Sequence, residues 1–226
     1  RLGLPGIPKL AEVMMIERDL RLVEMTGGRY HVAHVSTAES VEAVRRAKAR
    51  GLDVTCDTAP HYFALNEIAV GDYRTFAKVS PPLRSEDDRL AILEGVADGT
   101  IDAVASDHSP HDVESKRLPF AIAEPGIVGL ETLLPLSLQI YHGEKIGLLD
   151  LLARLSLRPA EILGLKAGRL AKGWPADLLI FHPERSWKIQ PDNFASKSKN
   201  SPFEGLPVQG RVRRTVVDGR ALFEAA

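Results

Sequence analysis

Residues 30–58, with the sequence YHVAHVSTAESVEAVRRAKARGLDVTCDT, decide the fold. Residues 30–36 predict a β-strand, and residues 39–50 predict a helix. Residues 52–58 alternate apolar and polar side chains, which is typical of a second strand. A strand, a helix and a strand in this order predict a βαβ unit of a parallel sheet.

Local signals mark where the predicted helices begin and end. Ser36 and Glu39 have the spacing of a capping box at the start of the helix in the βαβ unit. Ser85 can cap a further helix over residues 86–98, which Gly99 ends. An earlier helix over residues 9–26 places four apolar side chains on one stripe: Val13, Ile16, Leu20 and Val23.

Two more strand candidates follow the βαβ unit. Residues 101–106 (IDAVAS) predict a strand, and residues 76–80 (FAKVS) predict a weaker, shorter one. A complete (β/α)8 barrel runs to about 250 residues, so these strands correspond to the later half of one. We expect the remaining strands to come from residues outside this sequence or from a partner chain.

The pattern changes after residue 130. Three helices are predicted over residues 131–143, 148–157 and 159–165. Two β segments separated by turns are predicted over residues 168–183 and 210–223, with a polar loop over 192–205 between them. We therefore divide the chain into a barrel part, residues 1–165, and a small β part, residues 166–226.

The composition excludes several classes of protein. The 226 residues carry a formal net charge of −1 and are 44% hydrophobic, which is ordinary for a globular protein. The near-zero charge gives no electrostatic reason to expect binding to nucleic acid or to an anionic membrane. No apolar run approaches the roughly 18 residues of a membrane span. The single cysteine, Cys56, excludes an internal disulfide and favours a reducing, cytoplasmic location.

Polar side chains follow three of the predicted strands at the point where each strand ends. His34 ends the first strand, His61 lies just past the second, and Asp107 follows residues 101–106. Enzymes with (β/α)8 barrels keep their catalytic residues at this edge. Imidazole and carboxylate groups are suitable ligands for a divalent ion such as zinc. The pattern predicts a metal site in which Asp107 also accepts a proton from water.

For other polar residues near these strand ends, we expect roles other than metal binding. His31 lies three residues before His34 on the same predicted strand, so it should point to the opposite face and be packed or at the surface. His108 is expected to be structural. His111 is a candidate for contact with an anionic substrate group, and Ser80 lies on the loop after residues 76–80.

The two central residues have structural alternatives. His34 could be a hydrogen-bonded histidine at a strand end without a catalytic role. Asp107 could cap the turn that Ser109 and Pro110 follow. The placement of two histidines and an aspartate at the same edge of one sheet favours the metal site.

Six segments, in order along nearly the whole chain, together resemble the amidohydrolase superfamily and, within it, the class I dihydroorotases. They are HVAHVSTAESVEAVRRAK (31–48), TAPHYF (58–63), SPPLRSEDDR (80–89), ASDHSPH (105–111), PGIVGLETLLP (125–135) and GRLAKGWPADLLIF (168–181). The resemblance implies a metal-dependent (β/α)8 TIM-like barrel with a small β-sandwich at the C-terminus. It also implies that the segment 192–205 folds back across the domain.

The resemblance assigns roles to individual residues. His34 and His61 would bind one metal ion, and Asp107 would bind the other and act as general base. The cofactor would be one or two zinc ions, with other divalent metals left open. The substrate-binding residues would be Ser80, His111, Pro125 and Gly126, with His111 on the substrate carboxylate and the last two contacting the pyrimidine ring through their backbone.

The reaction implied by the resemblance is the interconversion of dihydroorotate and N-carbamoyl-L-aspartate in pyrimidine biosynthesis. The implied partners are this small substrate, a second copy of the chain in a homodimer and, as a further candidate, aspartate transcarbamoylase. An allantoinase-like cyclic amide hydrolase and an inactive scaffold for aspartate transcarbamoylase stay open as alternatives. His111 favours a substrate with a free carboxylate, which dihydroorotate has and allantoin lacks.

The chain departs from the family pattern in two ways. It contains no His-x-His pair, which the family carries on its first strand, and it lacks the bridging carboxylate or carboxylated lysine of the fourth strand. Ser80 stands where many relatives have Asn, and its hydroxyl has a shorter reach. We therefore expect these 226 residues alone to be inactive.

Overall fold

The computed structural model describes residues 2–4 and 6–225, and this part of the chain contains two three-stranded sheets. The first sheet is parallel, with its second strand in the middle: Tyr30–Val32 (β1), Val54–Thr58 (β2) and Ala103–Val104 (β3). The second sheet is antiparallel, again with its second strand in the middle: Leu178–Lys188 (β4), Pro207–Val217 (β5) and Arg220–Glu224 (β6).

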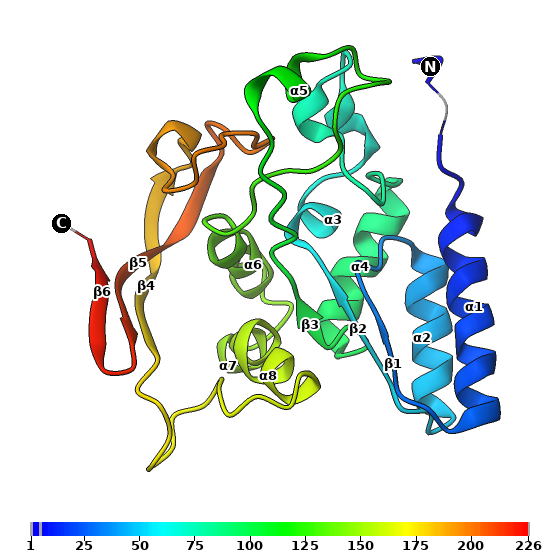
Figure 1. Ribbon diagram of the computed structural model, residues 1–226, viewed down its shortest axis with the longest axis horizontal. Helices are drawn as coiled ribbons and strands as arrows, with labels where there is room; N and C mark the ends of the chain where they lie inside the picture. The colour runs from blue at the N-terminus through cyan, green and yellow to red at the C-terminus, as the bar shows by residue number, and fades with distance from the viewer. Residues whose placement is uncertain (1, 5, 226) are drawn as a thin grey trace.

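Helices lie beside the parallel sheet, and some of them separate it from the antiparallel one (Figure 1). Their bounds are Lys9–Thr26 (α1), Ala38–Ala49 (α2), Pro60–Ala64 (α3), Glu86–Asp98 (α4), Val113–Arg117 (α5), Leu133–His142 (α6), Leu148–Leu152 (α7) and Arg158–Ile162 (α8). A π-helix, Ala153–Leu157, joins α7 to α8. Helices α1 and α2 lie side by side along one flank of the parallel sheet, and α6 to α8 lie between the two sheets (Figure 1).

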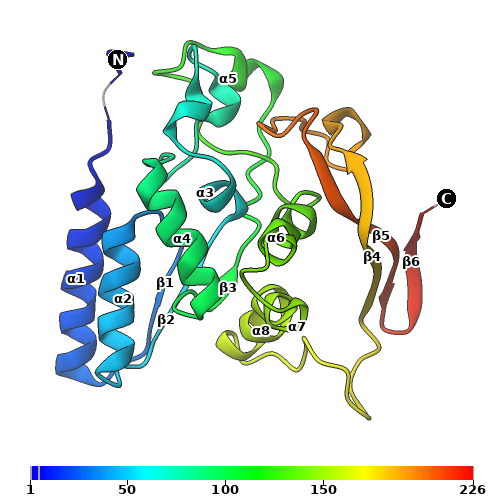
Figure 2. The same ribbon diagram turned by 180° about the vertical axis from the view of Figure 1, so that it is seen from behind.

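The predicted βαβ unit is confirmed. Strands β1 and β2 pair in parallel with Tyr30 opposite Val54, and β2 pairs in parallel with β3 with Asp57 opposite Ala103. The apolar face of α2 is buried against the sheet and its neighbours, since Val41 and Val44 are almost fully inaccessible. Seen from behind, the three strands run in the same direction, so their carboxyl ends meet at one edge (Figure 2).

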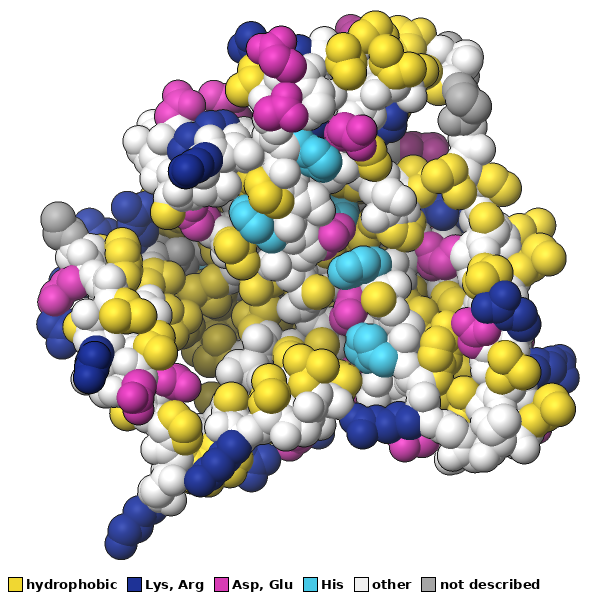
Figure 3. Space-filling model, viewed as in Figure 1, with side chains coloured by type: hydrophobic (Ala, Val, Ile, Leu, Met, Phe, Trp, Pro, Cys, Tyr) yellow, Lys and Arg dark blue, Asp and Glu magenta, His cyan; other side chains and the backbone are white. Residues whose placement is uncertain are grey.

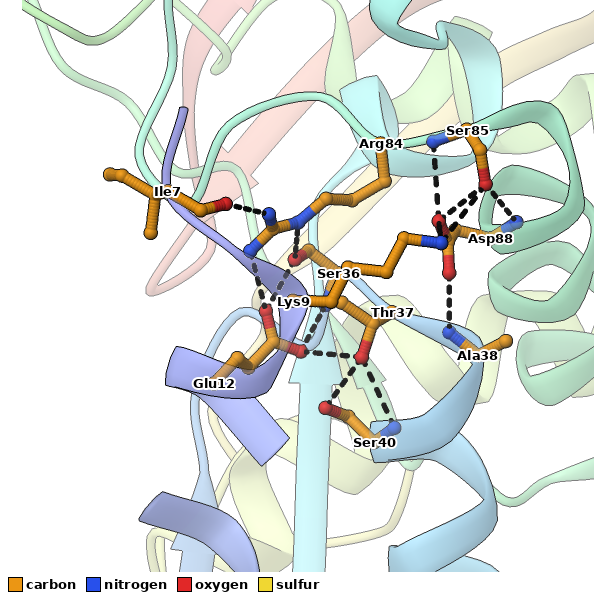
Figure 4. A network of polar contacts seen from close by, with 10 residues as sticks. All are labelled: Ile7, Lys9, Glu12, Ser36, Thr37, Ala38, Ser40, Arg84, Ser85 and Asp88. Carbon is orange, nitrogen blue, oxygen red and sulfur yellow. Dashed lines mark hydrogen bonds and ion pairs between the residues drawn. The ribbon is translucent and has the colours of Figure 1, made fainter. Parts of the chain in front are cut away.

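The predicted start of α2 is wrong by one residue. Thr37 is the N-cap, and its hydroxyl accepts a hydrogen bond from the backbone N–H of Ser40. Ser36 is occupied elsewhere, because its N–H and hydroxyl both donate to the carboxylate of Glu12 on α1 (Figure 4). A contact over 24 positions therefore decides which of two neighbouring hydroxyl residues caps the helix.

The predicted start of α4 is confirmed. Ser85 and Asp88 form a capping box, and Gly99 ends the helix with a φ of 86°. The Asp88 carboxylate also pairs with Lys9 and accepts from the N–H of Ala38, so it connects α4 to α1 and α2 (Figure 4).

The strand predicted over residues 76–80 does not form. Strands β2 and β3 pair directly with each other, so the parallel sheet has no position for a strand between them. A 3-10 helix, Thr75–Ala77, replaces its first half. The carbonyl of Lys78 instead accepts from the N–H of Gly126 at 2.8 Å, and two prolines without N–H donors follow at positions 81 and 82.

The C-terminal region contains the expected helices and β segments. The described residues show one antiparallel sheet there, and a second sheet that would complete a sandwich is not shown. The polar segment after β4 folds back as predicted, since Asn200 donates to the carbonyl of Ser109. Within the described residues, no helix combines the length and apolar character that a membrane crossing requires.

Candidate active site

Three side chains meet at the carboxyl edge of the parallel sheet. The carboxylate of Asp107 lies between two imidazoles, with Oδ1 3.8 Å from Nε2 of His34 and Oδ2 3.5 Å from Nε2 of His61. The space-filling view shows histidine side chains gathered on this face with acidic side chains between them (Figure 3). The structure thus brings together the three residues that the sequence predicted as metal ligands.

The backbone at His34 differs from the prediction. The strand ends at Val32, and His34 has a φ of 56°, in the left-handed region that side chains rarely adopt. The chain therefore turns before His34, so His31 and His34 do not point to opposite faces as expected. Both rings approach the carboxylate of Asp57.

Asp57 is a candidate site residue that the sequence analysis missed. Its Oδ2 lies 2.9 Å from Nε2 of His31, and its Oδ1 accepts from the backbone N–H of His34 at 2.8 Å. The Nδ1 atom of His34 lies 3.1 Å from the same Oδ1. The signal in the sequence is a carboxylate in the penultimate position of a buried strand, next to a predicted strand that carries histidines. The apolar–polar alternation of residues 52–58 accounts for an aspartate there without a role in the site.

The charges of this group follow from its contacts. Burial alone would raise the pKa of Asp57, but the contacts from His31 and His34 outweigh burial and hold that pKa well below its usual range. The Asp57 carboxylate in turn raises the pKa of His34, against the opposing effect of burial. Asp57 is therefore an anion that lies beside Nδ1 of His34, while Nε2 of the same ring lies on the side of Asp107.

His61 is held in a different environment. It lies in the first turn of α3, just after Pro60, and its side chain is 1% exposed. Its ring packs on that of Tyr62 with 4.1 Å between centroids, and the Tyr62 hydroxyl donates to the carbonyl of Pro81. Burial, aided by the nearby charge of His34, lowers the pKa of His61 to about 3, so the ring is neutral.

Asp107 completes the cluster. Its φ of 45° is again left-handed, and the residue is partly buried. Burial raises the pKa of Asp107, His34 lowers it, and the negative charge of Asp57 raises it further. Two of the three central residues, His34 and Asp107, thus have a backbone conformation that is costly for a residue with a side chain, which is common where function constrains geometry.

The donor types of this cluster suit a divalent metal ion, although the described residues do not form a complete metal site. The buried Nε2 of His61 has no hydrogen-bond partner among the described residues, although it faces Asp107. Neutral imidazoles with a carboxylate are the ligands that zinc prefers, and a carboxylate behind a ligating histidine, as Asp57 is behind His34, is a common support. Within residues 2–4 and 6–225, no three or more such side chains are grouped closely enough to hold an ion on their own.

Three of the four predicted substrate-side residues, His111, Pro125 and Gly126, lie next to one another. The Nε2 atom of His111 lies 2.9 Å from the carbonyl oxygen of Pro125, and Gly126 has a φ of 127°. A Cβ on Gly126 would lie 2.6 Å from Cβ of Ser109 and 3.0 Å from Nε2 of His111, so the backbone there must be glycine. Asn200, which the sequence analysis did not select, donates to the carbonyl of Gly126 at 3.1 Å.

His108 and Ser80 are the remaining residues named from the sequence, and within the described residues neither side chain makes a hydrogen bond to the cluster of His34, His61 and Asp107. The Nδ1 atom of His108 accepts from the N–H of Gly129 at 3.1 Å, which is the structural role expected for it. Ser80 is exposed, and its hydroxyl makes no hydrogen bond to the rest of the described chain. The structure therefore gives no contact that connects Ser80 to the cluster of His34, His61 and Asp107.

The profile of the amidohydrolase family matches residues 7–222. The chain belongs to the amidohydrolase family. The dihydroorotase of Anaplasma phagocytophilum (strain HZ) is 51% identical over 225 residues, which are 99% of this chain and 50% of that relative. The dihydroorotase of Desulforapulum autotrophicum is 49% identical over 224 residues, 99% of this chain and 52% of that relative. The chain spans about half the length of the curated relatives that it matches.

Solved structures of a hydantoinase and a dihydropyrimidinase have the same fold. The L-hydantoinase (dihydropyrimidinase) from Arthrobacter aurescens superposes with a TM-score of 0.91 at 34% identity and covers 96% of this chain, which spans 49% of that structure. The dihydropyrimidinase from Brevibacillus agri NCHU1002 has a TM-score of 0.91 at 25% identity over 96% of this chain and 49% of that chain. The expected relation to barrel amidohydrolases is confirmed at the level of the family, which is metal-dependent.

Proposed function

We propose that this chain carries the C-terminal part of a dihydroorotase, which interconverts dihydroorotate and N-carbamoyl-L-aspartate. The observation that carries the proposal is the convergence of His34, His61 and Asp107 at the carboxyl edge of the sheet. Relatives of about half identity that are named dihydroorotase support the substrate. Because the chain spans about half of those relatives, the activity belongs to the intact protein.

The proposed metal ligands are His34, His61 and Asp107, with zinc as the metal and one or two ions as the expected number. Further ligands would come from residues outside this sequence. When bound, a zinc ion polarises a carbonyl group and lowers the pKa of water. Asp57, whose Oδ1 lies 3.1 Å from Nδ1 of His34, would orient the ring of His34. Burial would keep His61 neutral so that its lone pair is available.

Asp107 is the proposed general base. Its carboxylate is only partly buried and follows β3 at the carboxyl edge of the parallel sheet. There it can take a proton from water and return it to the leaving amide nitrogen. His111 is proposed to bind the substrate carboxylate, while the backbone of Pro125 and Gly126 would contact the ring of the substrate. Ser80 is proposed as a weaker substrate contact, since it lies exposed on its loop.

The larger architecture is part of the same proposal. Residues 1–165 would form the later part of a (β/α)8 barrel, and residues 166–226 part of a β-sandwich with the closing loop. The antiparallel sheet supports this division because β6 is exposed along its whole length, as expected of a sheet that lacks its partner. A homodimer, an association with aspartate transcarbamoylase and a cytoplasmic location stay predictions.

A cyclic amide without a carboxylate is the alternative substrate class. The similarity to structures named hydantoinase and dihydropyrimidinase favours this class. Their sequences are 34% and 25% identical to this chain. His111 distinguishes the two classes, because a histidine at this position serves a substrate carboxylate and has no such partner in hydantoin or dihydrouracil. An inactive scaffold is disfavoured by the presence of His34, His61 and Asp107 together.

A substrate panel tests the proposal. Intact protein loaded with zinc is assayed for ring opening of dihydroorotate, dihydrouracil, hydantoin and allantoin, with an Asp107→Asn variant as the background control. We expect ring opening of dihydroorotate with a kcat/KM at least about 100-fold above that of the other three, a discrimination typical of a site that binds a charged group. Preference for hydantoin or dihydrouracil would assign the alternative class, and no turnover of any substrate would assign the scaffold.

A further inference from the structure

Lys116 on α5 is the largest fully buried side chain of the described residues, although it carries an amine. Its Nζ donates to the carbonyl of Glu124 at 2.7 Å and to that of Gly126 at 3.0 Å. Burial, together with the nearby charge of Lys78, lowers the pKa of Lys116 to about 8. A buried lysine is costly, and its hydrogen bonds to two loop carbonyls give it a specific structural task.

Lys78 makes the same kind of contact with the preceding residues of this loop. Its Nζ donates to three backbone carbonyls: Phe120 at 2.8 Å, Ala121 at 3.1 Å and Ala123 at 2.6 Å. The carbonyl of Lys78 accepts from the N–H of Gly126 at 2.8 Å. Two amines thus satisfy carbonyls along residues 120–126, a segment that lies outside any strand.

The segment held by these lysines is the one that faces His111. The carbonyl of Gly126 accepts from Lys116 and also from Asn200, which lies 3.1 Å away on the polar segment after β4. The neighbouring carbonyl of Pro125 accepts from His111 at 2.9 Å. A displacement of residues 120–126 would therefore move the backbone of Pro125 and Gly126 and release the ring of His111.

We propose that Lys78 and Lys116 are positioning residues, which fix residues 120–126 so that Pro125, Gly126 and His111 form the substrate-side wall of the site. This inference rests on the proposed function for the identity of the substrate, but not for the order of the loop. Neither lysine reaches the cluster of His34, His61 and Asp107 through a contact in the described residues, so both act on substrate binding and not on the metal ligands.

The first test measures the order of the loop without any substrate. Lys78→Met and Lys116→Met are made in the intact protein, with Lys145→Met as the matched control because Lys145 is exposed. Amide hydrogen exchange is followed by mass spectrometry. We expect exchange about tenfold or more faster over residues 118–126 in both variants, with unchanged exchange over residues 54–64 and unchanged bound zinc. Lys78→Arg, which keeps the donors, should restore slow exchange.

The second test measures where the kinetic defect appears. For both variants, KM for dihydroorotate should rise about tenfold or more while kcat changes much less, because the lost contact is in substrate binding. Lys145→Met should leave both constants unchanged. If Lys116→Met does not fold, Lys78→Met carries the test, since Lys78 is only partly buried.

Three outcomes would overturn the proposal. The first is that hydrogen exchange over residues 118–126 is unchanged in both variants. The second is that exchange over residues 54–64 increases as much as exchange over residues 118–126. The third is that the variants lose zinc and that only their kcat falls, with KM unchanged. If wild-type protein opens no dihydroorotate ring, the proposed function fails, yet the exchange and zinc measurements still decide whether the two lysines hold the loop.

Discussion

The carboxylate of Asp107 faces the buried imidazole of His61, with Oδ2 and Nε2 3.5 Å apart. The two residues are brought together because β2 and β3 are direct neighbours in a parallel sheet, so the loops that follow them leave the same edge. His34 approaches the other oxygen of the same carboxylate from the loop after β1. Three successive strand ends of one sheet thus supply the cluster that the proposed chemistry requires.

Asp107 and His111 should fail differently when they are changed. Asp107→Asn keeps the shape but removes the base, and loss of a general base lowers kcat by about 10²- to 10⁴-fold. His111→Ala removes a charge-assisted contact worth about 1.5–3 kcal/mol, so KM should rise roughly 10- to 150-fold with little change in kcat. Steady-state kinetics in both directions and metal analysis by mass spectrometry measure this, with His142→Ala as the control.

The expected metal contents also differ. Asp107→Asn should be depleted of metal, and His111→Ala should retain it, because His111 contacts Pro125 and not the cluster. If His111→Ala loses metal while Asp107→Asn keeps metal and full activity, the assignment of ligand, base and substrate contact is wrong.

Asp57→Asn should weaken metal binding although Asp57 is not a proposed ligand. The amide cannot hold the rings of His31 and His34 as the carboxylate does, so the ring of His34 loses its orientation. Loss of such a supporting carboxylate lowers metal affinity by about 10- to 100-fold. Competition with a chelator gives the affinity, and Asp53→Asn, at an exposed position, is the control. Equal affinities in the two variants would show that Asp57 has no part in the site.

Features that depend on neighbouring residues could be predicted from the sequence, and features that depend on contacts between distant residues could not. The positions of His34, His61 and Asp107 could be predicted because a βα pattern alone places the ends of parallel strands at one edge. Asp57 could not be selected, because its role depends on a backbone turn at His34 that only the folded chain shows. Likewise, Thr37 and not Ser36 caps α2 because Ser36 binds Glu12, which is distant in sequence.

The network around Asp88 predicts a pH dependence of stability. Burial alone would raise the pKa of Asp88, but Lys9, Ser85 and the N–H of Ala38 hold it below its usual value (Figure 4). The stabilisation from this group is therefore full above its unfolded pKa of about 3.9 and is lost as pH falls through the lower folded value.

Asp88→Asn removes this stabilisation at neutral pH. We expect a loss of about 1.5–3 kcal/mol in the free energy of unfolding at pH 7, and a smaller difference from wild type in acid. Urea denaturation at pH 7 and at pH 3 measures both, with exposed Asp53→Asn as the control. A difference that grows on acidification would contradict the sign of the effect.

Gly126→Ala tests the close approach between the loop and His111. The new Cβ would meet Ser109 and His111 at a φ of 127°, so we expect a loss of about 1–3 kcal/mol in the free energy of unfolding. Gly164→Ala separates strain from collision. Gly164 also has a positive φ, 67°, but no atom apart from those of its chain neighbours lies within 4 Å of the position that its new Cβ would take. The second variant should lose less stability and keep KM, and equal losses would exclude the collision.

The location of bound zinc tests the central claim most directly. Crystals of the intact protein with zinc are measured by X-ray diffraction on both sides of the zinc absorption edge, and an anomalous difference map gives the position of the metal. We predict a peak within bonding distance of Nε2 of His34, Nε2 of His61 or the carboxylate of Asp107, with the first two sharing one ion. A fully occupied zinc peak elsewhere, with none at these atoms, would contradict the account.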